Sequence, residues 1–413
     1  MGIGQKNPKT FFLVLAWALY DFANQFFALN VIALYFPRWL TIEKGCPEIF
    51  YSISFGISMF FVAVLAPILG TISDSTQRRK IFLVYFTILS ILFTLSIGLS
   101  TTVILALIFF AIANFGCQEA IVFYNALMVE VTNQGRIGFV SGLGRMFGYG
   151  GAIMALYLSK PIIAKFGYQA TFFLTAGLFL LFALPCMIFI KEKRAESPVK
   201  FSYFFRRTQL VEIFQKLKNT ALRSGKHLGF NNFLMAAFFW LCAVNAIILF
   251  MSVYATKVFG LDDLQVIDFL IFSTFFAILG SILSGYLSDK IGYKRTLVIT
   301  FFLWAGCILA GAFGSPPFHW VIGAFAGASL GATWVVFRAA VIELTPRENI
   351  GQAFGLFNLL GYLAGVIGPL FWGLALLFLS SLGQWGYRLT LFSLILFICL
   401  GFMFFLKIPK ITR

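Results

Sequence analysis

The sequence predicts an all-α membrane protein with twelve transmembrane helices arranged in two pseudo-symmetric six-helix halves. Three observations lead to this prediction. The chain of 413 residues is 60% hydrophobic and contains 54 Phe, whereas a soluble domain is roughly 45–50% apolar. It divides into twelve apolar stretches, each near the length of about 20 residues that a bilayer helix needs. Finally, strings of the first half recur in the second half at a nearly constant offset.

The expected segments follow one another closely and are bounded by charges, Pro or Gly, which act as breakers. Those of the first half lie near 11–37, 49–72, 81–99, 102–131, 138–160 and 168–190, and those of the second near 229–256, 264–288, 296–314, 317–344, 350–379 and 386–407. The chain therefore divides into a half over 1–190, a connection over 191–228 and a half over 229–413. Apolar residues at helical spacing in the basic connection predict an amphipathic helix on the inner leaflet, used as a tether.

The distribution of positive charge predicts the orientation. Lys and Arg together number 31, against 15 Asp and Glu, and in membrane proteins they concentrate in cytoplasmic loops. With both termini in the cytoplasm, few of them would face outside: Arg38, Lys44, Lys160, Lys165, Lys257 and Arg388. We therefore expect both termini to be cytoplasmic and the protein to be a multi-pass protein of the cell (inner) membrane. The positive charge then reports topology, and we expect no nucleic-acid partner.

Metal, redox and nucleotide chemistry find little support in the sequence. The six Cys are scattered singly, so they form neither a disulfide framework nor a metal motif. His227 and His319 have no partners of a catalytic or metal-binding set nearby in the sequence. The phosphate-binding string Gly-x-x-x-x-Gly-Lys-Ser/Thr does not occur, which disfavours an ATP-driven pump. We expect no enzyme, no metal and no cofactor apart from a coupling proton.

One repeated string stands at the predicted cytoplasmic edge of the second helix of each half. Gly70-Thr-Ile-Ser-Asp74 corresponds to Gly285-Tyr-Leu-Ser-Asp289, and a basic cluster follows each copy. The string resembles the signature loop of the major facilitator superfamily, although Ser75 and Gln77 depart from the family pattern. The resemblance implies a gate on the cytoplasmic side. The residues expected to act in gating are Gly70, Asp74, Arg78, Arg79, Glu130, Arg145, Gly285, Asp289, Lys290, Lys294, Arg295 and Glu343.

Three further strings narrow the resemblance. They are Trp17-Ala-Leu-Tyr-Asp21-Phe-Ala-Asn24, Val122-Phe-Tyr124-Asn125-Ala-Leu127 and Ser141-Gly-Leu-Gly-Arg145-Met-Phe-Gly148-Tyr149-Gly150-Gly151. They look like the hallmark segments of the vacuole-effluxer-like branch, whose fungal members are described as exporting amino acids from the vacuole. Phe337 stands where that branch usually carries a Ser before Arg338. The resemblance implies the major facilitator fold and alternating access, and it leaves the solute open.

The expected site follows from polar residues inside apolar segments. In major facilitators the first, fourth, seventh and tenth helices line the cavity, and the corresponding polar or aromatic residues here are Asp21, Asn24, Gln118, Glu119, Asn125, Trp240, Asn245, Trp334 and Arg338. A charge at the centre of a bilayer helix costs about 2.5–3.5 kcal/mol on insertion scales. We therefore expect Asp21, Glu119 and Arg338 to form the charged centre of a cavity. Helix packing is the alternative role for the two carboxylates, and Arg145 either snorkels to the surface or pairs with Glu130.

The most direct functional prediction is secondary transport of a small polar solute, such as an amino acid, by alternating access of the two halves. Proton coupling is an option that the buried carboxylates allow. A substrate-sensing receptor on the same fold and a lipid or lysolipid flippase are the alternatives, and the polar set on the lining helices argues against the flippase. The expected partners are the small-molecule substrate and the lipid bilayer, and we expect a monomer.

Overall fold

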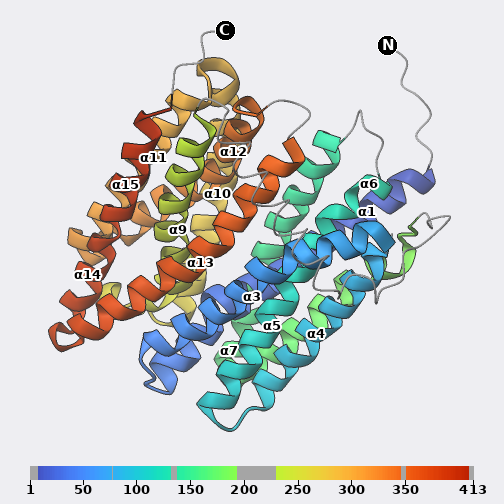
Figure 1. Ribbon diagram of the computed structural model, residues 1–413. Coiled ribbons are helices and arrows are strands. Elements are labelled where there is room, and N and C mark those ends of the chain that lie inside the picture. Colours follow the sequence, from blue (N-terminus) through green and yellow to red (C-terminus); the bar gives the residue numbers. More distant parts are fainter. Residues whose placement is uncertain (1–7, 77, 132–136, 193–228, 346–349, 409–413) are drawn as a thin grey trace. The chain divides into compact units, whose positions relative to one another are not determined.

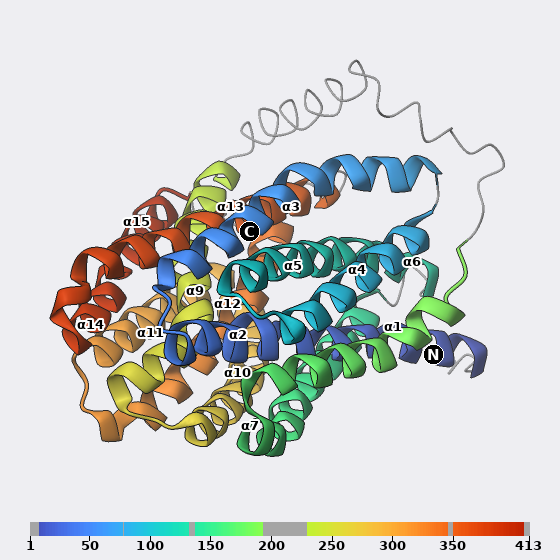
Figure 2. The same cartoon turned by 90° about the horizontal axis from the view of Figure 1, so that it is seen from below.

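The computed structural model describes residues 8–76, 78–131, 137–192, 229–345 and 350–408, and in these ranges the regular elements are helices (Figures 1 and 2). The first group of consecutive helices comprises α1 (Pro8–Phe26), the π-helical η1 (Phe27–Tyr35), α2 (Phe36–Arg38), η2 (Trp39–Glu43), α3 (Glu48–Thr76), α4 (Arg79–Leu99), α5 (Val103–Ala126), α6 (Met128–Val131) and α7 (Ile137–Phe189). The remaining elements are α9 (Phe230–Phe259), α10 (Asp263–Ile291), α11 (Tyr293–Phe313), η5 (Pro316–Phe318), α12 (His319–Glu343), α13 (Ile350–Leu379), η7 (Ser380–Leu382), α14 (Gln384–Ser393) and α15 (Ile395–Leu406).

Eleven helices of the described ranges are long and apolar enough to cross a membrane. The prediction of twelve crossings is therefore not confirmed, and the difference arises in α7. Its apolar part, Leu143–Phe189, has 47 residues and would be about 70 Å long if straight, more than twice the thickness of a bilayer core. Gly167 interrupts its helical backbone with φ 74° and ψ −172°. This break lies where the sequence predicts the loop between the fifth and sixth segments.

Local signals explain where several helices begin and end. The side chain of Asp262 accepts a hydrogen bond from the backbone N–H of Gln265, and Gln265 bonds back to the backbone of Asp262, which fixes the start of α10. The same helix ends at Gly292, whose φ of +84° favours glycine. The expected connection 191–228 lies outside the described residues apart from 191 and 192, so its predicted amphipathic helix is not described.

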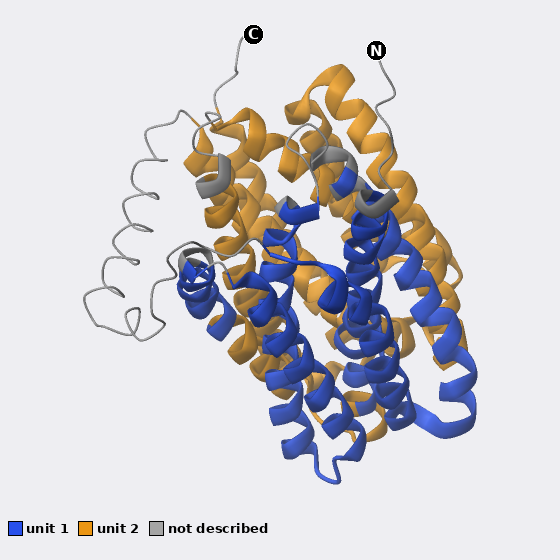
Figure 3. Cartoon of the chain, turned by 90° about the vertical axis from the view of Figure 1, so that its right-hand side faces the viewer, with its two compact units in different colours: residues 1–39, 61–214 blue, residues 40–60, 215–413 orange. Residues whose placement is uncertain are grey.

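The chain divides into two compact units (Figure 3). Unit 1 consists of residues 1–39 and 61–214, and unit 2 of residues 40–60 and 215–413. The long helix α3 contributes to both, because its residues up to 60 belong to unit 2 and the rest to unit 1. Within unit 2 the beginning of α3 contacts α13 and α14: the hydroxyl of Tyr387 donates a hydrogen bond to the carboxylate of Glu48, and a Cβ at Gly373 would lie 2.6 Å from Ser52 Oγ.

Glycines permit the closest helix contacts within each unit. In unit 2 a Cβ at Gly327 of α12 would lie 2.0 Å from the backbone oxygen of Ser273 in α10, and one at Gly331 would lie 2.0 Å from that of Ala277. In unit 1 a Cβ at Gly116 of α5 would lie 2.9 Å from the backbone oxygen of Phe86 in α4. Small residues let membrane helices approach backbone to backbone, where dispersion contacts replace the missing hydrophobic driving force.

In each unit, a lysine near the start of one helix binds a backbone carbonyl at or just after the end of the last helix. In unit 1, Lys80 of α4 donates from Nζ to the carbonyl of Ile188 in α7 over 2.9 Å. In unit 2, Lys294 of α11 donates from Nζ to the carbonyl of Ile408 over 2.8 Å. A cation satisfies carbonyls that have no partner within their own helix and complements the negative end of the helix dipole. We call these two contacts the lysine tethers.

Cys46 lies in the loop between η2 and α3, and its reaction with a thiol reagent would test which side of the membrane this loop faces. Burial and the nearby Glu48 carboxylate raise the pKa of its thiol above the usual value. We expect its reaction with a membrane-impermeant maleimide to accelerate as pH rises towards about 9, because only the thiolate reacts. Glu48→Gln should accelerate labelling at neutral pH by less than about tenfold, since burial is the larger cause of the shift.

The measurement is the initial labelling rate in intact cells, with Cys46→Ser as the background control. The four cysteines Cys117, Cys186, Cys242 and Cys307 are buried and should contribute little to that background. Labelling only from the cytoplasmic side would contradict the predicted topology, and a rate independent of pH would contradict the raised pKa.

Candidate functional site

Asp21 lies on α1 against a row of glycines in α7. A Cβ at Gly148 would lie 3.1 Å from Asp21 Oδ2, and a Cβ at Gly144 would lie 2.7 Å from the ring of Trp17, one turn earlier in α1. Gly151 is closer still, because its Cβ would lie 2.4 Å from the backbone oxygen of Phe22. The glycine string of α7 thus makes room for the Asp21 carboxylate and for the backbone of α1.

Aromatic rings surround this position. Trp17 stacks on Tyr124 of α5 with ring centroids 4.5 Å apart, and its Nε1 donates to the backbone carbonyl of Tyr124 over 3.0 Å. Tyr20 stacks on the same ring at 4.9 Å, and its hydroxyl is 2.6 Å from that of Thr87 in α4. These contacts hold Tyr124 rigidly beside α1.

The hydroxyl of Tyr124 is buried and has no hydrogen-bond partner in the described part of the chain. It lies beside the α7 glycines, since a Cβ at Gly144 would be 3.2 Å from it. The Asp21 carboxylate lies beside Gly148 of the same glycine string. Tyr124 therefore offers, next to the glycines that also seat Asp21, one buried hydroxyl that has no partner among the described residues.

Glu119 lies on another face of α5. Cys117 donates from Sγ to Oδ1 of Asn24 over 2.9 Å, so the face with Cys117 and Tyr124 is turned towards α1. Because each residue turns an α-helix by about 100°, Glu119 is rotated about 200° from Cys117. Its side chain is fully buried, and neither carboxylate oxygen has a hydrogen-bond partner among the described residues.

The structure gives Asp21 and Glu119 different surroundings: Asp21 lies against α7, and Glu119 lies on a face of α5 other than the one turned towards α1. The joint role predicted for Asp21, Glu119 and Arg338 stays a prediction. Depth along a helix can be read from sequence spacing, whereas the face depends on the contacts of α5 with α1 and α4. Of the neighbouring predicted residues, Gln118 is half-buried and Asn125 is exposed.

The predicted residues of the second half belong to unit 2. Trp240 lies in an aromatic cluster, in edge contact with Phe301 at 5.6 Å and Phe337 at 5.5 Å, and is only 2% exposed. This places Trp240 in the packed core. Asn245, Trp334 and Arg338 are half-buried, and Glu343 ends α12. The predicted role of Arg338 stays a prediction.

The structure describes the predicted gating loop of unit 2 more fully than that of unit 1. Asp289, Lys290 and Arg295 are exposed, and the Lys290 ammonium lies 5.6 Å from the centre of the Tyr286 ring. The side chain of Asp74 is outside the described part. A Cβ at Gly70 would meet nothing within 4 Å, and a Cβ at Gly285 would meet only Val335 at 3.8 Å.

The basic residues of the first loop serve the start of α4. Arg78 precedes the helix and Arg79 opens it, while the backbone N–H of Lys80 donates to Glu192 Oε2 over 2.9 Å. Burial raises the pKa of Glu192, against the lowering effect of the hydrogen bonds from the Lys80 and Arg79 backbones. Arg145 is exposed, and among the described residues no ion pair joins it to Glu130.

Three residues of this region were not in the predicted site. Trp17 and Tyr124 stand in two of the strings that carry the family resemblance. These strings indicate the family, but their pattern does not mark either aromatic residue as part of a site. Asn30 is the third: it is fully buried in the π-helical η1, donates from Nδ2 to Thr175 Oγ1 over 3.0 Å and leaves its Oδ1 without a partner in the described residues. An Asn inside an apolar run, followed by Pro37, was the available signal.

Comparisons with known proteins agree with this fold. A profile of the Major Facilitator Superfamily matches residues 10–287 and 263–413. An uncharacterized protein of Aquifex aeolicus is 29% identical over 402 residues, which cover 97% of this chain and 98% of that protein. An uncharacterized MFS-type transporter of Bacillus subtilis, YxiO, is 25% identical and covers 96% of this chain and 95% of its own.

Solved structures of low sequence identity share the fold. The nucleoside transporter NupG matches with a TM-score of 0.73 at 14% identity and covers 96% of this chain and 99% of its own. A bacterial homolog of the human lysosomal transporter Spinster, inward-facing and unoccupied, matches with a TM-score of 0.72 at 16% identity and covers 98% of each chain. The family profile spans most of the sequence, and the chain therefore belongs to the major facilitator superfamily.

Proposed function

We propose that this chain is a secondary active transporter for a small zwitterionic solute such as an amino acid, that it works by alternating access, and that proton binding drives it. Membership of a transporter superfamily supports transport in general. The observation that carries the finer proposal is the buried hydroxyl of Tyr124, which has no partner among the described residues and lies beside the same α7 glycines as the Asp21 carboxylate.

This arrangement suits an amino acid for chemical reasons. The carboxylate of Asp21 would bind the solute ammonium, and the guanidinium of Arg145 would bind the solute carboxylate, through hydrogen bonds that charge strengthens. The aromatic wall of Trp17 and Tyr20 would contact the apolar part of the solute. Such sites commonly combine apolar walls with a few polar groups that fix orientation.

Glu119 supplies the proposed proton site. A fully buried carboxyl without hydrogen-bond partners is costly in its charged form, so it would hold a proton while dry and release it when water enters. A D-xylose–proton symporter shares this fold with a TM-score of 0.67 at 14% identity, and the multi-drug resistance efflux pump PmrA of Streptococcus pneumoniae is 23% identical over 391 residues. We place the protein in the cell membrane as a monomer.

The test is a thermal-shift screen of the purified full chain, followed by uptake into liposomes. A ligand that binds the folded state raises its stability by mass action. We expect amino acids to raise the melting temperature more than sugars or nucleosides, and an imposed pH gradient to drive accumulation of the binding amino acid. Movement of a lipid between the leaflets of the liposomes, without binding of any amino acid, would indicate a flippase, and amino-acid binding without transport would indicate a receptor.

Gly148→Ala tests whether the seat of Asp21 matters. The new Cβ would be 3.1 Å from Asp21 Oδ2, so the carboxylate must shift by a few tenths of an ångström. We expect uptake of the amino acid to fall roughly tenfold. Even a small displacement of a charged binding group can lower the rate by a large factor. Measured uptake per folded transporter is the readout.

Gly150→Ala is the matched control, because its Cβ would meet only Phe22 at an ordinary 3.8 Å. Equal uptake by the two variants would show that Asp21 tolerates displacement and takes no direct part in binding.

A further inference from the structure

A pocket of about 450 Å³ opens within unit 1 at the ends of three helices, away from Asp21 and Tyr124. Its lining residues come from the start of α1, from α6 and from the end of α7 and the residues after it: Phe12, Leu13, Glu130, Val131, Phe189, Ile190 and Lys191. We call it the α1–α6–α7 pocket. The proposed solute site does not use it.

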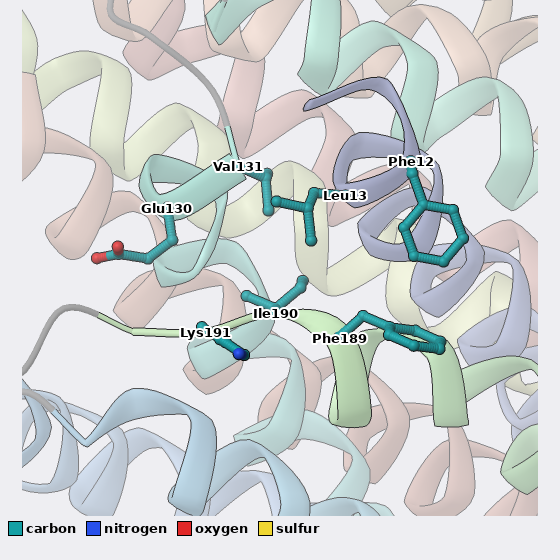
Figure 4. A pocket seen from close by; sticks show the side chains of 7 residues that line it. All are labelled: Phe12, Leu13, Glu130, Val131, Phe189, Ile190 and Lys191. Atoms are coloured by element: carbon teal, nitrogen blue, oxygen red, sulfur yellow. The ribbon is translucent and has the colours of Figure 1, made fainter. Parts of the chain in front are cut away.

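The pocket has one charged end and one apolar end, as Figure 4 shows. Glu130 and Lys191 lie at one end, and the rings of Phe12 and Phe189 lie at the other. These rings are in edge contact at 5.0 Å and are about half exposed, at 46% and 47%. The exposed aromatic rings offer an apolar surface that a hydrocarbon chain can cover.

The two charged residues of the pocket are available to a ligand. In the part of the chain that the structure describes, no ion pair joins Glu130 to Lys191. The neighbouring charged groups are already engaged, because Lys80 Nζ donates to the carbonyl of Ile188 and Glu192 accepts from the Lys80 backbone. A ligand in the pocket would therefore meet one carboxylate and one ammonium that the described part of the protein does not pair with each other.

The position along the helices selects the kind of ligand. The apolar spans of α5 and α7 end at Ala126 and Phe189, and Glu130 and Lys191 follow these ends. The apolar end of the pocket therefore belongs to the spans, and its charged end lies just beyond them. A molecule with an acyl chain and a headgroup carrying both charges fits this order. Lipid headgroups are bound in this way by charged pockets at the membrane surface.

We propose that the α1–α6–α7 pocket binds phosphatidylethanolamine. The lipid phosphate would bind the Lys191 ammonium, the primary ammonium of the lipid would donate to the Glu130 carboxylate, and an acyl chain would lie on Phe12 and Phe189. A choline headgroup carries the same charge but has no N–H to donate. A glycerol headgroup has no cation and would place its net negative charge near Glu130.

The experiment titrates the delipidated full-length protein in detergent with dioleoyl phosphatidylethanolamine, phosphatidylcholine or phosphatidylglycerol, and follows the melting temperature. We expect the ethanolamine lipid to bind about fivefold more tightly than either other lipid, a factor typical of one exposed charged hydrogen bond. Glu130→Gln should remove this preference, and Lys191→Gln should weaken all three lipids.

The matched controls are Glu43→Gln and Lys44→Gln, which remove the same charges from an exposed ion pair of 3.0 Å elsewhere in the chain. These controls should leave every lipid affinity unchanged. Equal affinity of the wild-type protein for the three lipids would overturn the proposal, as would a loss in the controls as large as that in the pocket variants.

Discussion

Replacing Glu119 by Gln is expected to abolish accumulation of the solute driven by a pH gradient, while exchange of solute down its own gradient continues. Gln has nearly the same shape but cannot take up or release a proton. The site is fully buried and without hydrogen-bond partners in the described residues, so removing the charge should not weaken folding. The variant should therefore lose proton coupling but keep solute binding, because Glu119 faces away from α1, where the proposed solute site lies.

The measurement compares, in the same liposomes, uptake driven by a pH gradient with exchange at equal pH on both sides. Glu43→Gln serves as the control that removes a carboxylate from an exposed position. Accumulation that depends on pH as strongly in Glu119→Gln as in the wild type would show that another group carries the proton, and Glu119 would then be a packing residue of α5.

Gly327→Ala is expected to destabilise the protein strongly. The added Cβ would be 2.0 Å from the backbone oxygen of Ser273 and 3.2 Å from the backbone nitrogen of Ala277. Backbone atoms cannot move aside as a side-chain end can, so α10 and α12 would have to separate and lose contact along their length. We expect a loss of about 3 kcal/mol or more in the free energy of unfolding, the upper range of overpacked cores.

Gly306→Ala in α11 is the control, because a Cβ there would meet nothing within 4 Å. It should change the melting temperature little or raise it slightly, since Ala favours a helix over Gly. The readout is the melting temperature of the purified proteins in one detergent. Similar values for the two variants would contradict the close packing of α10 against α12.

Much of the fold could be predicted because apolar length and charge determine where a chain enters and leaves a bilayer. The break at Gly167 illustrates this: the sequence places a loop between 160 and 168, and the backbone departs from helical geometry there. The start of α3 was less accessible. The sequence of residues 40–60 does not predict that they belong to unit 2. Their assignment depends on contacts between distant parts of the chain, such as the hydrogen bond from Tyr387 to Glu48.

For the site, the sequence identifies unusual residues but not the neighbours of each side chain. Polarity inside an apolar segment identifies Asp21, Asn24 and Glu119 as unusual, but it does not say which neighbour each side chain meets. The contact of Asn24 with Cys117 turns Glu119 away from α1, and the orientation of α5 results from backbone contact at Gly116. Trp17 and Tyr124 were overlooked because aromatic residues abound in this sequence and polarity does not single them out.

The lysine tethers bear on the descent of the protein. Lys80 and Lys294 are each the second residue of the helix that follows the repeated string, and each binds a carbonyl at or just after the end of the last helix of its own unit. A contact shared by both copies is most simply inherited from a single six-helix ancestor, before its gene was duplicated and fused.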